Sequence, residues 1–160
     1  MAPNARVNYL AQCWGPDGLK WEDRSHNTVT TAGKNYLLAT GLAGGTAITA
    51  WYLGLKGTGA ATVLDSLSSH VAWSEISTVY VATTRSVWTG GTAASGSIDN
   101  SAATAAFSIK TTATVYGAFL ADQPATSTST GKLYSAADFA ASRSVASSDT
   151  LNIVATFTIS

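Results

Sequence analysis

Charged side chains are scarce in this chain. Asp, Glu, Lys and Arg make up 11% of its 160 residues, less than half of the usual share of about 25%. Nine basic and nine acidic residues give a formal net charge of zero, and no basic cluster could neutralise phosphates, so we expect no nucleic acid partner. Ser and Thr take the place of the missing charges, and such a surface repels neighbouring proteins weakly. The composition therefore favours a component of a protein assembly.

Cysteine and long apolar runs are also nearly missing. Cys13 is the only cysteine, so no disulfide can form within the chain, and a lone thiol fits a reducing compartment. We expect this thiol to be buried. No run of about 18 apolar residues is present, which predicts no membrane span and no membrane partner. Residues 1–6 lack the apolar core of a signal peptide, so export by that route is not expected.

The usual patterns of catalysis and metal binding are missing as well. His26 and His70 are the only histidines, and no Gly-x-Ser-x-Gly sequence offers either of them a nucleophile. No zinc spacing, calcium loop or phosphate loop occurs. We expect His70 to hydrogen-bond a nearby loop, and the adjacent acids Glu22 and Asp23 to form a solvated end balanced by neighbouring basic residues. The sequence thus predicts no catalytic residue, no metal, no cofactor and no enzymatic activity.

The chain does contain sequence patterns that are typical of β-strands. Three apolar, uncharged runs, at residues 47–55, 111–120 and 150–159, are bounded by turn signals and are typical of buried strands. We expect all three to be inner strands of one β core. The predicted core residues from these runs are Trp51, Leu53, Val115, Phe119, Ile153 and Phe157.

The N-terminal part predicts a hairpin and a short helix. Residues 7–24 alternate between apolar and polar on both sides of Gly15-Pro16-Asp17-Gly18, a strong turn signal. Residues 30–42 change to a helical period, with Thr30 or Thr31 able to cap the start and Gly41 able to end it. A second short helix is expected over 60–67, where the apolar residues share one helical face.

The rest of the chain shows short strands between turns. Further strands are predicted over residues 78–84, 95–99, 107–110 and 132–135, and the last apolar run is taken to start at 149. Residues 122–131 are expected to form an exposed polar loop that is mobile unless a partner orders it. The sequence therefore predicts one mainly β domain over 1–160, an antiparallel jelly roll or β-sandwich with one or two short helices and its main β core in 47–160.

The order of these signals is similar to that of a known family. The series comprises Leu19-Lys20-Trp21-Glu22-Asp23, Asn27 to Leu38, Trp51-Tyr52-Leu53-Gly54-Leu55, Ser69 to Glu75, Ala118-Phe119-Leu120, Ser142-Arg143-Ser144-Val145 and Asp149-Thr150-Leu151. Over roughly residues 7–159 it resembles small jelly-roll virion proteins of tailed bacteriophages, the capsid cement or decoration proteins. The resemblance implies a non-enzymatic protein, made in the host cytoplasm, that binds the major capsid protein on the capsid exterior and stabilises the shell.

Two expectations concern contacts. Trp14 and Trp88 lie beside Gly-rich turns and are predicted to be partly exposed and to contact protein, since Trp is enriched at interface hot spots. The run over 149–159 carries a single charge, at Asp149, and would be hazardous as a free edge, so a homo-dimer or trimer is expected. The alternatives are a phage tail, neck or fibre component, or a carbohydrate-binding attachment module that uses exposed Trp residues.

Overall fold

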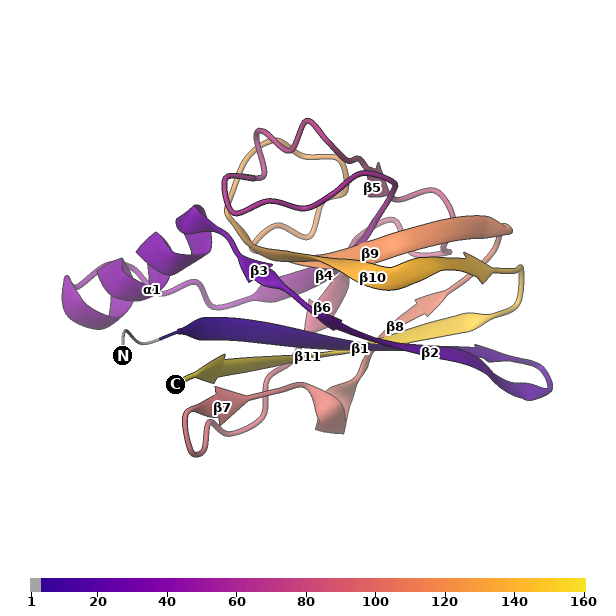
Figure 1. Cartoon of the computed structure of the whole chain (residues 1–160), viewed down its shortest axis with the longest axis horizontal. Coiled ribbons are helices and arrows are strands. Elements are labelled where there is room, and N and C mark those ends of the chain that lie inside the picture. The colour runs from indigo at the N-terminus through magenta and orange to yellow at the C-terminus, as the bar shows by residue number, and fades with distance from the viewer. Residues whose placement is uncertain (1–3) are drawn as a thin grey trace.

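A computed structural model describes residues 4–160, and these residues form two antiparallel β-sheets that face each other, with one α-helix at an end of the sandwich (Figure 1). The first sheet contains β1 (Ala5–Gly15), β2 (Gly18–His26), β7 (Ser97–Ile98), β8 (Ala105–Ser108) and β11 (Thr150–Ile159). The second contains β3 (Thr28–Val29), β4 (Trp51–Lys56), β5 (Glu75–Ile76), β6 (Ser86–Trp88), β9 (Ala113–Ala121) and β10 (Leu133–Val145). The helices are α1 (Thr31–Leu42) and a 3₁₀ turn, η1 (Ser101–Ala103).

The strand orders confirm the mainly β, antiparallel sandwich. The first sheet has the order β2-β1-β11-β7, with β8 also pairing β11, and the second has the order β3-β10-β9-β4-β5, with β6 also pairing β4. The three apolar runs correspond to β4, β9 and β11, each paired on both sides. They are inner strands, as predicted, but β11 lies in the opposite sheet from the other two. The jelly-roll connectivity stays a prediction.

The predicted hairpin and first helix are both present. β1 and β2 pair around the turn, where Gly15 faces Gly18 and Gly18 adopts a φ of 119°, which glycine tolerates. The side chain of Thr30 caps α1 by accepting a hydrogen bond from the N–H of Gly33 at 3.0 Å. Gly41 does not end this helix, which continues to Leu42.

The second predicted helix, over 60–67, is wrong. This segment forms turns because the buried carboxylate of Asp65 accepts hydrogen bonds from the backbone N–H and the hydroxyl of Thr62, both at 2.9 Å. Such local bonds favour a turn over a helix. The same carboxylate accepts a bond from the indole N–H of Trp73 at 2.8 Å, which fixes the turn to a buried side chain.

Several strand boundaries also differ from the prediction. Residues 47–50 precede the strand that begins at Trp51. Residues 78–84 make two isolated bridges instead of a strand, because Tyr80 pairs with Ile109 whereas Thr84 pairs with Ala125 in a different segment. β10 extends ten residues past the predicted 132–135, to Val145. Its Ala, Ser and charged residues lack the apolar alternation by which strands are recognised. β7 is shorter than predicted, and β8 begins at Ala105.

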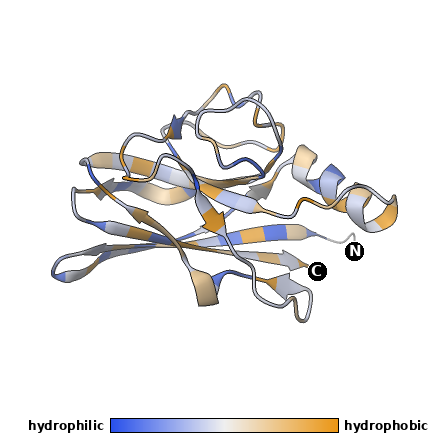
Figure 2. Cartoon of the chain, turned by 180° about the vertical axis from the view of Figure 1, so that it is seen from behind, coloured by the Kyte–Doolittle hydropathy of each residue, from blue (hydrophilic) through white to orange (hydrophobic). Residues whose placement is uncertain are grey.

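The hydrophobic core has two parts. Hydrophobic and hydrophilic residues alternate along several strands (Figure 2), as expected for strands with one buried face. Leu53, Val115 and Ile153 are fully buried in the larger cluster. Phe119 is buried too, but in the smaller cluster with Trp73 and Leu67. β9 is thus covered on both faces, which explains its nearly continuous apolar run. The other two predicted core residues, Trp51 and Phe157, are only half-buried, and the reason is a cavity described below.

Side chains close one edge between the two sheets. Asp23 on β2 accepts hydrogen bonds from the Arg143 guanidinium and from the N–H of Ala140, both on β10. The indole N–H of Trp21 donates to the carbonyl oxygen of Ser144 at 2.8 Å. The expectation of a solvated acid pair is therefore wrong for Asp23, which is 2% exposed. Asp23 is buried because it lies opposite the part of β10, between Asp138 and Arg143, where the pairing with β9 is interrupted.

The expected reason for self-association is also wrong. β11 is not a free edge, because β1 pairs with one side of it and β7 and β8 with the other. One edge of the first sheet is β2, which carries Lys20, Glu22 and Arg24, and the opposite edge is formed by the short strands β7 and β8. Charges on an edge strand oppose strand addition by another chain. A dimer or trimer therefore needs a different contact from the one that the sequence suggested.

Candidate functional site

The most distinctive surface of the molecule is formed by residues 31–74, here called the uncharged surface. This segment contains three charged side chains, Lys34, Lys56 and Asp65, and the last two are buried. Exposed large apolar side chains take the place of charges on this segment: Leu38 (58% exposed), Leu42 (84%), Val63 (45%), Leu64 (80%) and Val71 (97%). The start of α1 and the loop after β4 lie side by side, because the N–H of Thr31 donates to the carbonyl oxygen of Val63 at 2.8 Å.

The helix α1 contributes most of its own surface to this region. Gly33 is its one buried residue, and an added Cβ there would overlap the carbonyl oxygen of Tyr134. Close backbone contact at Gly33 thus docks the start of the helix on β10. The remaining turns project from the end of the sandwich (Figure 1), with Leu38 and Leu42 one turn apart on the same side. A helix that exposes two leucines in this way has a side free for a partner.

The loop that follows β4 is held by a buried cation. The ammonium of Lys56 lies 2.5 Å from a carboxylate oxygen of Asp138 and donates hydrogen bonds to the carbonyl oxygens of Gly57 and Gly59. It also lies 5.6 Å from the centre of the Trp73 ring, within range of a cation–π interaction. The other carboxylate oxygen of Asp138 accepts from the N–H of Ala61. The apolar residues of this loop are therefore presented from a fixed backbone.

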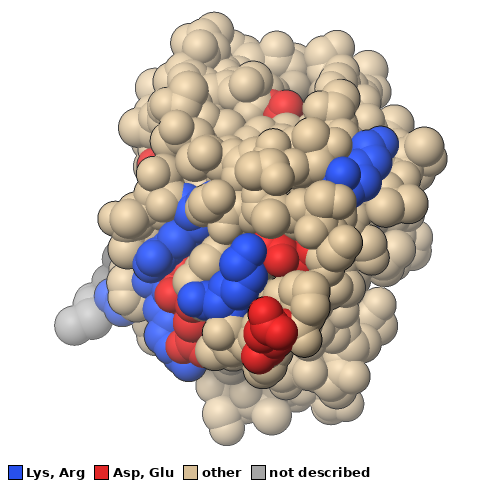
Figure 3. All heavy atoms as spheres, turned by 90° about the vertical axis from the view of Figure 1, so that its right-hand side faces the viewer, with Lys and Arg blue, Asp and Glu red and all other residues tan. Residues whose placement is uncertain are grey.

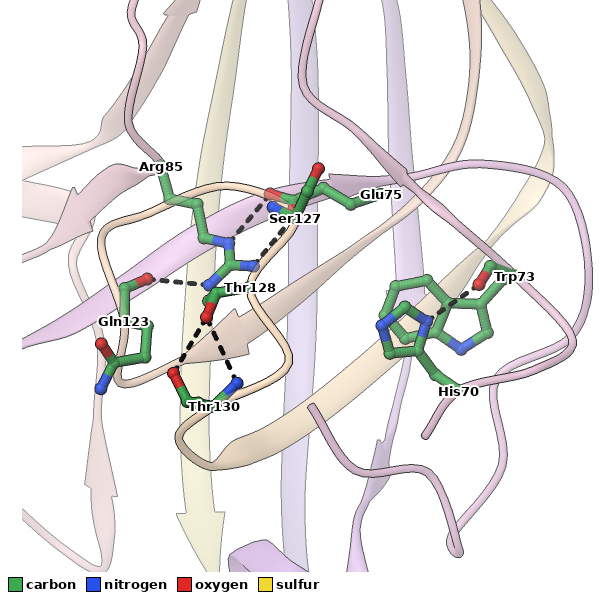
Figure 4. A network of polar contacts seen from close by, with 8 residues as sticks. All are labelled: His70, Trp73, Glu75, Arg85, Gln123, Ser127, Thr128 and Thr130. Carbon is green, nitrogen blue, oxygen red and sulfur yellow. Dashed lines mark hydrogen bonds and ion pairs between the residues drawn. The ribbon is translucent and has the colours of Figure 1, made fainter. Parts of the chain in front are cut away.

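The polar loop over 122–131 is fixed by a second ion pair (Figure 4). Arg85, 3% exposed, donates two hydrogen bonds to the Glu75 carboxylate, at 2.9 and 2.8 Å, and one to the carbonyl oxygen of Gln123. Glu75 in turn accepts from the N–H of Ser127 at 2.7 Å. The prediction was that only a partner would order this loop, but these bonds within the chain hold its backbone.

Each histidine is hydrogen-bonded within the chain. The Nδ1 of His70 lies 2.9 Å from the carbonyl oxygen of Trp73, and its ring stacks on the indole with 4.1 Å between centroids (Figure 4). The predicted bond of His70 to a nearby loop is confirmed. The Nδ1 of His26 lies 2.8 Å from the side-chain oxygen of Asn8. The two imidazoles belong to different parts of the fold, one to the hairpin and one to the loop after β4.

The two tryptophans predicted to contact protein lie far apart. Trp14 on β1 pairs with Thr150, at the start of β11, and is 40% exposed. Trp88 on β6 is half-buried against Phe157, near the end of β11, and its indole N–H donates to the carbonyl oxygen of Ala155. The structure therefore places the two residues at opposite ends of β11, and they do not form one contact surface.

Trp88 instead belongs to a chain of aromatic rings that lines a cavity. Tyr36 contacts Trp51, Trp51 contacts Tyr134, Tyr134 contacts Phe157 and Phe157 contacts Trp88, all edge to face with centroids 5.0–5.5 Å apart. These rings come from α1 and both sheets and line a cavity of about 420 Å³, here called the aromatic pocket. It explains why Trp51 and Phe157 are half-buried. No sequence pattern joined Tyr36 and Tyr134 to this group.

The charged residues gather at the other end of the sandwich, around the β1–β2 hairpin. Viewed from that end, charged side chains crowd the lower part of the face and the rest is nearly uncharged (Figure 3). Lys20 pairs with Asp149 at 2.7 Å, and Arg24 with Glu22 at 2.9 Å. The hairpin end is thus rich in ion pairs, whereas the charged residues on and beside α1 are the exposed Arg6 and Lys34, which form no ion pair within residues 4–160.

Asp149 is the most constrained of these charges. Burial by itself raises the pKa of its carboxyl group, but hydrogen bonds from the Lys20 ammonium, the Ala146 N–H and the Cys13 thiol outweigh burial and lower that pKa. Burial and the neighbouring carboxylate raise the pKa of the Cys13 thiol to about 12. As predicted, Cys13 is a buried free thiol, and at neutral pH it is protonated and inert.

Within residues 4–160, no three His, Cys, Asp or Glu side chains are grouped so that they could hold a metal ion. In the same part of the chain, no helix combines the length and hydropathy needed to cross a bilayer. Compared with protein-family models, with curated proteins and with solved structures, the chain shows no match. The function of this chain is therefore inferred from its exposed surfaces.

Proposed function

We propose that this chain is a structural virion protein that binds the outer surface of a tailed-phage capsid and stabilises it, with the major capsid protein as its partner. The observation that carries the proposal is the uncharged surface, where α1 and the loop after β4 expose Leu42, Leu64 and Val71. Apolar side chains on a fixed backbone dock on another protein without a large loss of conformational entropy. The family resemblance in the sequence supplies the capsid as that other protein.

The charge distribution suits such a role. The α1 end, with its exposed leucines, faces the shell, and the ion-paired hairpin end faces solvent and keeps the free protein soluble. Repetition of one modest contact over a lattice of shell subunits gives a large total resistance to internal pressure. In this arrangement the protein does not need to contact DNA. Self-association as a dimer or trimer remains part of the proposal, with α1 or the adjacent loop as the contact.

The location and copy number in purified virions test the proposal. Quantitative mass spectrometry of the particle, combined with particle imaging, is expected to find many copies spread over the shell exterior. A few copies at a single vertex would instead indicate a tail or neck protein, and density on a fibre would indicate an attachment protein. Absence of the chain from virions would overturn the structural role.

A further inference from the structure

We propose that the aromatic pocket binds a small amphiphile with an apolar, ring-containing body and a single anionic head group. Its volume of about 420 Å³ lies within the range of small-molecule sites, roughly 300–1,000 Å³. The ligand proposal does not rest on the proposed assembly role, although the pocket shares Tyr36, Leu37 and Trp51 with the uncharged surface.

The lining defines the body of the ligand. Five aromatic rings in continuous edge-to-face contact form one wall, and Leu37, Ile98 and Leu120 add aliphatic surface. The Tyr36 hydroxyl accepts from the N–H of Ile48, which leaves its own O–H as a donor, and the Trp88 indole N–H is already donated to the carbonyl oxygen of Ala155. Few donors and acceptors remain for a sugar, which needs many. The pocket therefore selects an apolar body.

The mouth of the pocket defines the head group. Arg6, an exposed residue of β1, is the one charged residue among those that line the pocket. It takes part in no ion pair with any other residue in 4–160. Arg6 also borders a second, polar cavity lined by Asn8, His26 and Lys34 and by no acidic residue. The guanidinium of Arg6 therefore lies between an apolar pocket and a polar cavity without acidic residues. It can pair with a carboxylate or sulfonate of a ligand whose apolar body fills the aromatic pocket.

Fluorescence titration with the dye 8-anilinonaphthalene-1-sulfonate tests the site, since the dye has the proposed ring body and anion. We expect saturable binding of one dye per folded chain. Arg6→Gln is expected to weaken binding about fivefold, the effect of an exposed charge pair, whereas Arg24→Gln, which removes the same charge from the hairpin, leaves the affinity unchanged. N-phenyl-1-naphthylamine, which lacks the sulfonate, is expected to bind more weakly and to be insensitive to Arg6→Gln.

A steric variant separates the pocket from the general surface. Ala93 is exposed at the pocket wall, so Ala93→Phe is expected to block both dyes without lowering the melting temperature, while Ala82→Phe, at an exposed position outside the pocket, has no effect. Absence of saturable binding, or equal binding by the Ala93→Phe and parent proteins, would overturn the proposal. Tighter binding of N-acetyl-tryptophanamide or of a disaccharide than of the dye would overturn it in favour of a peptide or a sugar.

Discussion

Asp23 and Arg143 join the two sheets at the edge between β2 and β10, with the carboxylate 2.7 Å from one guanidinium nitrogen and 3.0 Å from another. The same carboxylate accepts the N–H of Ala140, on a stretch of β10 that lies opposite the hairpin. One buried side chain therefore satisfies both a cation and a strand backbone. This pair, more than any turn, fixes how the hairpin lies on the second sheet.

Replacement of Asp23 by Ala is expected to destabilise the fold by about 2 kcal/mol, because it leaves the Arg143 charge and a backbone N–H without their partner. Urea unfolding followed by circular dichroism measures the change. Glu22→Ala is the matched control, since Glu22 is a half-exposed acid next in sequence, and a change within about 0.5 kcal/mol is expected there. Equal effects of the two variants would contradict the role given to Asp23.

Phe119→Ala is expected to cost about 3–5 kcal/mol. The ring is 1% exposed, packs on Trp73 with centroids 5.3 Å apart and lies beneath the Arg85 guanidinium. Its removal leaves a cavity under both fixed loops. Val71→Ala, at a position that is 97% exposed, is the control and should change the free energy of unfolding by less than about 0.5 kcal/mol. A loss below about 1 kcal/mol for Phe119→Ala would count against the smaller core cluster.

The ionised Asp149 carboxylate makes the stability of the fold depend on pH. Because its folded pKa lies below the ordinary value of 3.8, its contribution is fully present above that value and is lost as the pH falls through the lower, folded pKa. Asp149→Asn is expected to be less stable than the parent at neutral pH by about 1–3 kcal/mol. The difference should shrink as the pH falls below about 4. Thermal melts over this range measure it, with Asp17→Asn, in the exposed hairpin turn, as the control. A pH-independent difference would refute the assignment.

Binding to shells is expected to resist salt. Ion pairs on a surface are screened at about 1 M salt, where the Debye length is about 3 Å, but apolar contacts are not. The uncharged surface contains Lys34 as its one exposed charge, so co-sedimentation with shells should be unchanged between low and high salt. Complete release by salt alone would show that the ion-paired hairpin end makes the contact.

Local sequence signals predicted much of the fold because local chemistry decides those elements. The Gly15–Gly18 turn, the Thr30 cap and the uncharged runs of β9 and β11 each act within a few residues. Length and sheet membership were harder, since β10 has no apolar alternation and is held by β9 and by Asp23. The second helix was wrong because the Asp65 carboxylate bonds the backbone and hydroxyl of Thr62, which favours a turn that the apolar periodicity did not reveal.

The candidate sites were less accessible to sequence reasoning. Trp14 and Trp88 were grouped because both lie beside glycines, but only the strand register shows that they lie at opposite ends of β11. The aromatic pocket draws rings from α1, β4, β6, β10 and β11, so no window of sequence contains it. The uncharged surface is the exception, because the scarcity of charge over residues 31–74 is visible in the sequence, although its exposure is not.

The claim that the uncharged surface makes the capsid contact is tested most directly by co-sedimentation of two matched variants with purified shells. Leu42→Glu places a charge at the exposed end of α1, and Leu19→Glu places the same charge on the hairpin, where Leu19 is 48% exposed. Both should fold, with melting temperatures close to that of the parent. The account predicts that Leu42→Glu weakens shell binding at least about tenfold, as an unpaired charge in an apolar interface does, and that Leu19→Glu binds as the parent does. Full binding by Leu42→Glu, together with loss of binding by Leu19→Glu, would contradict it.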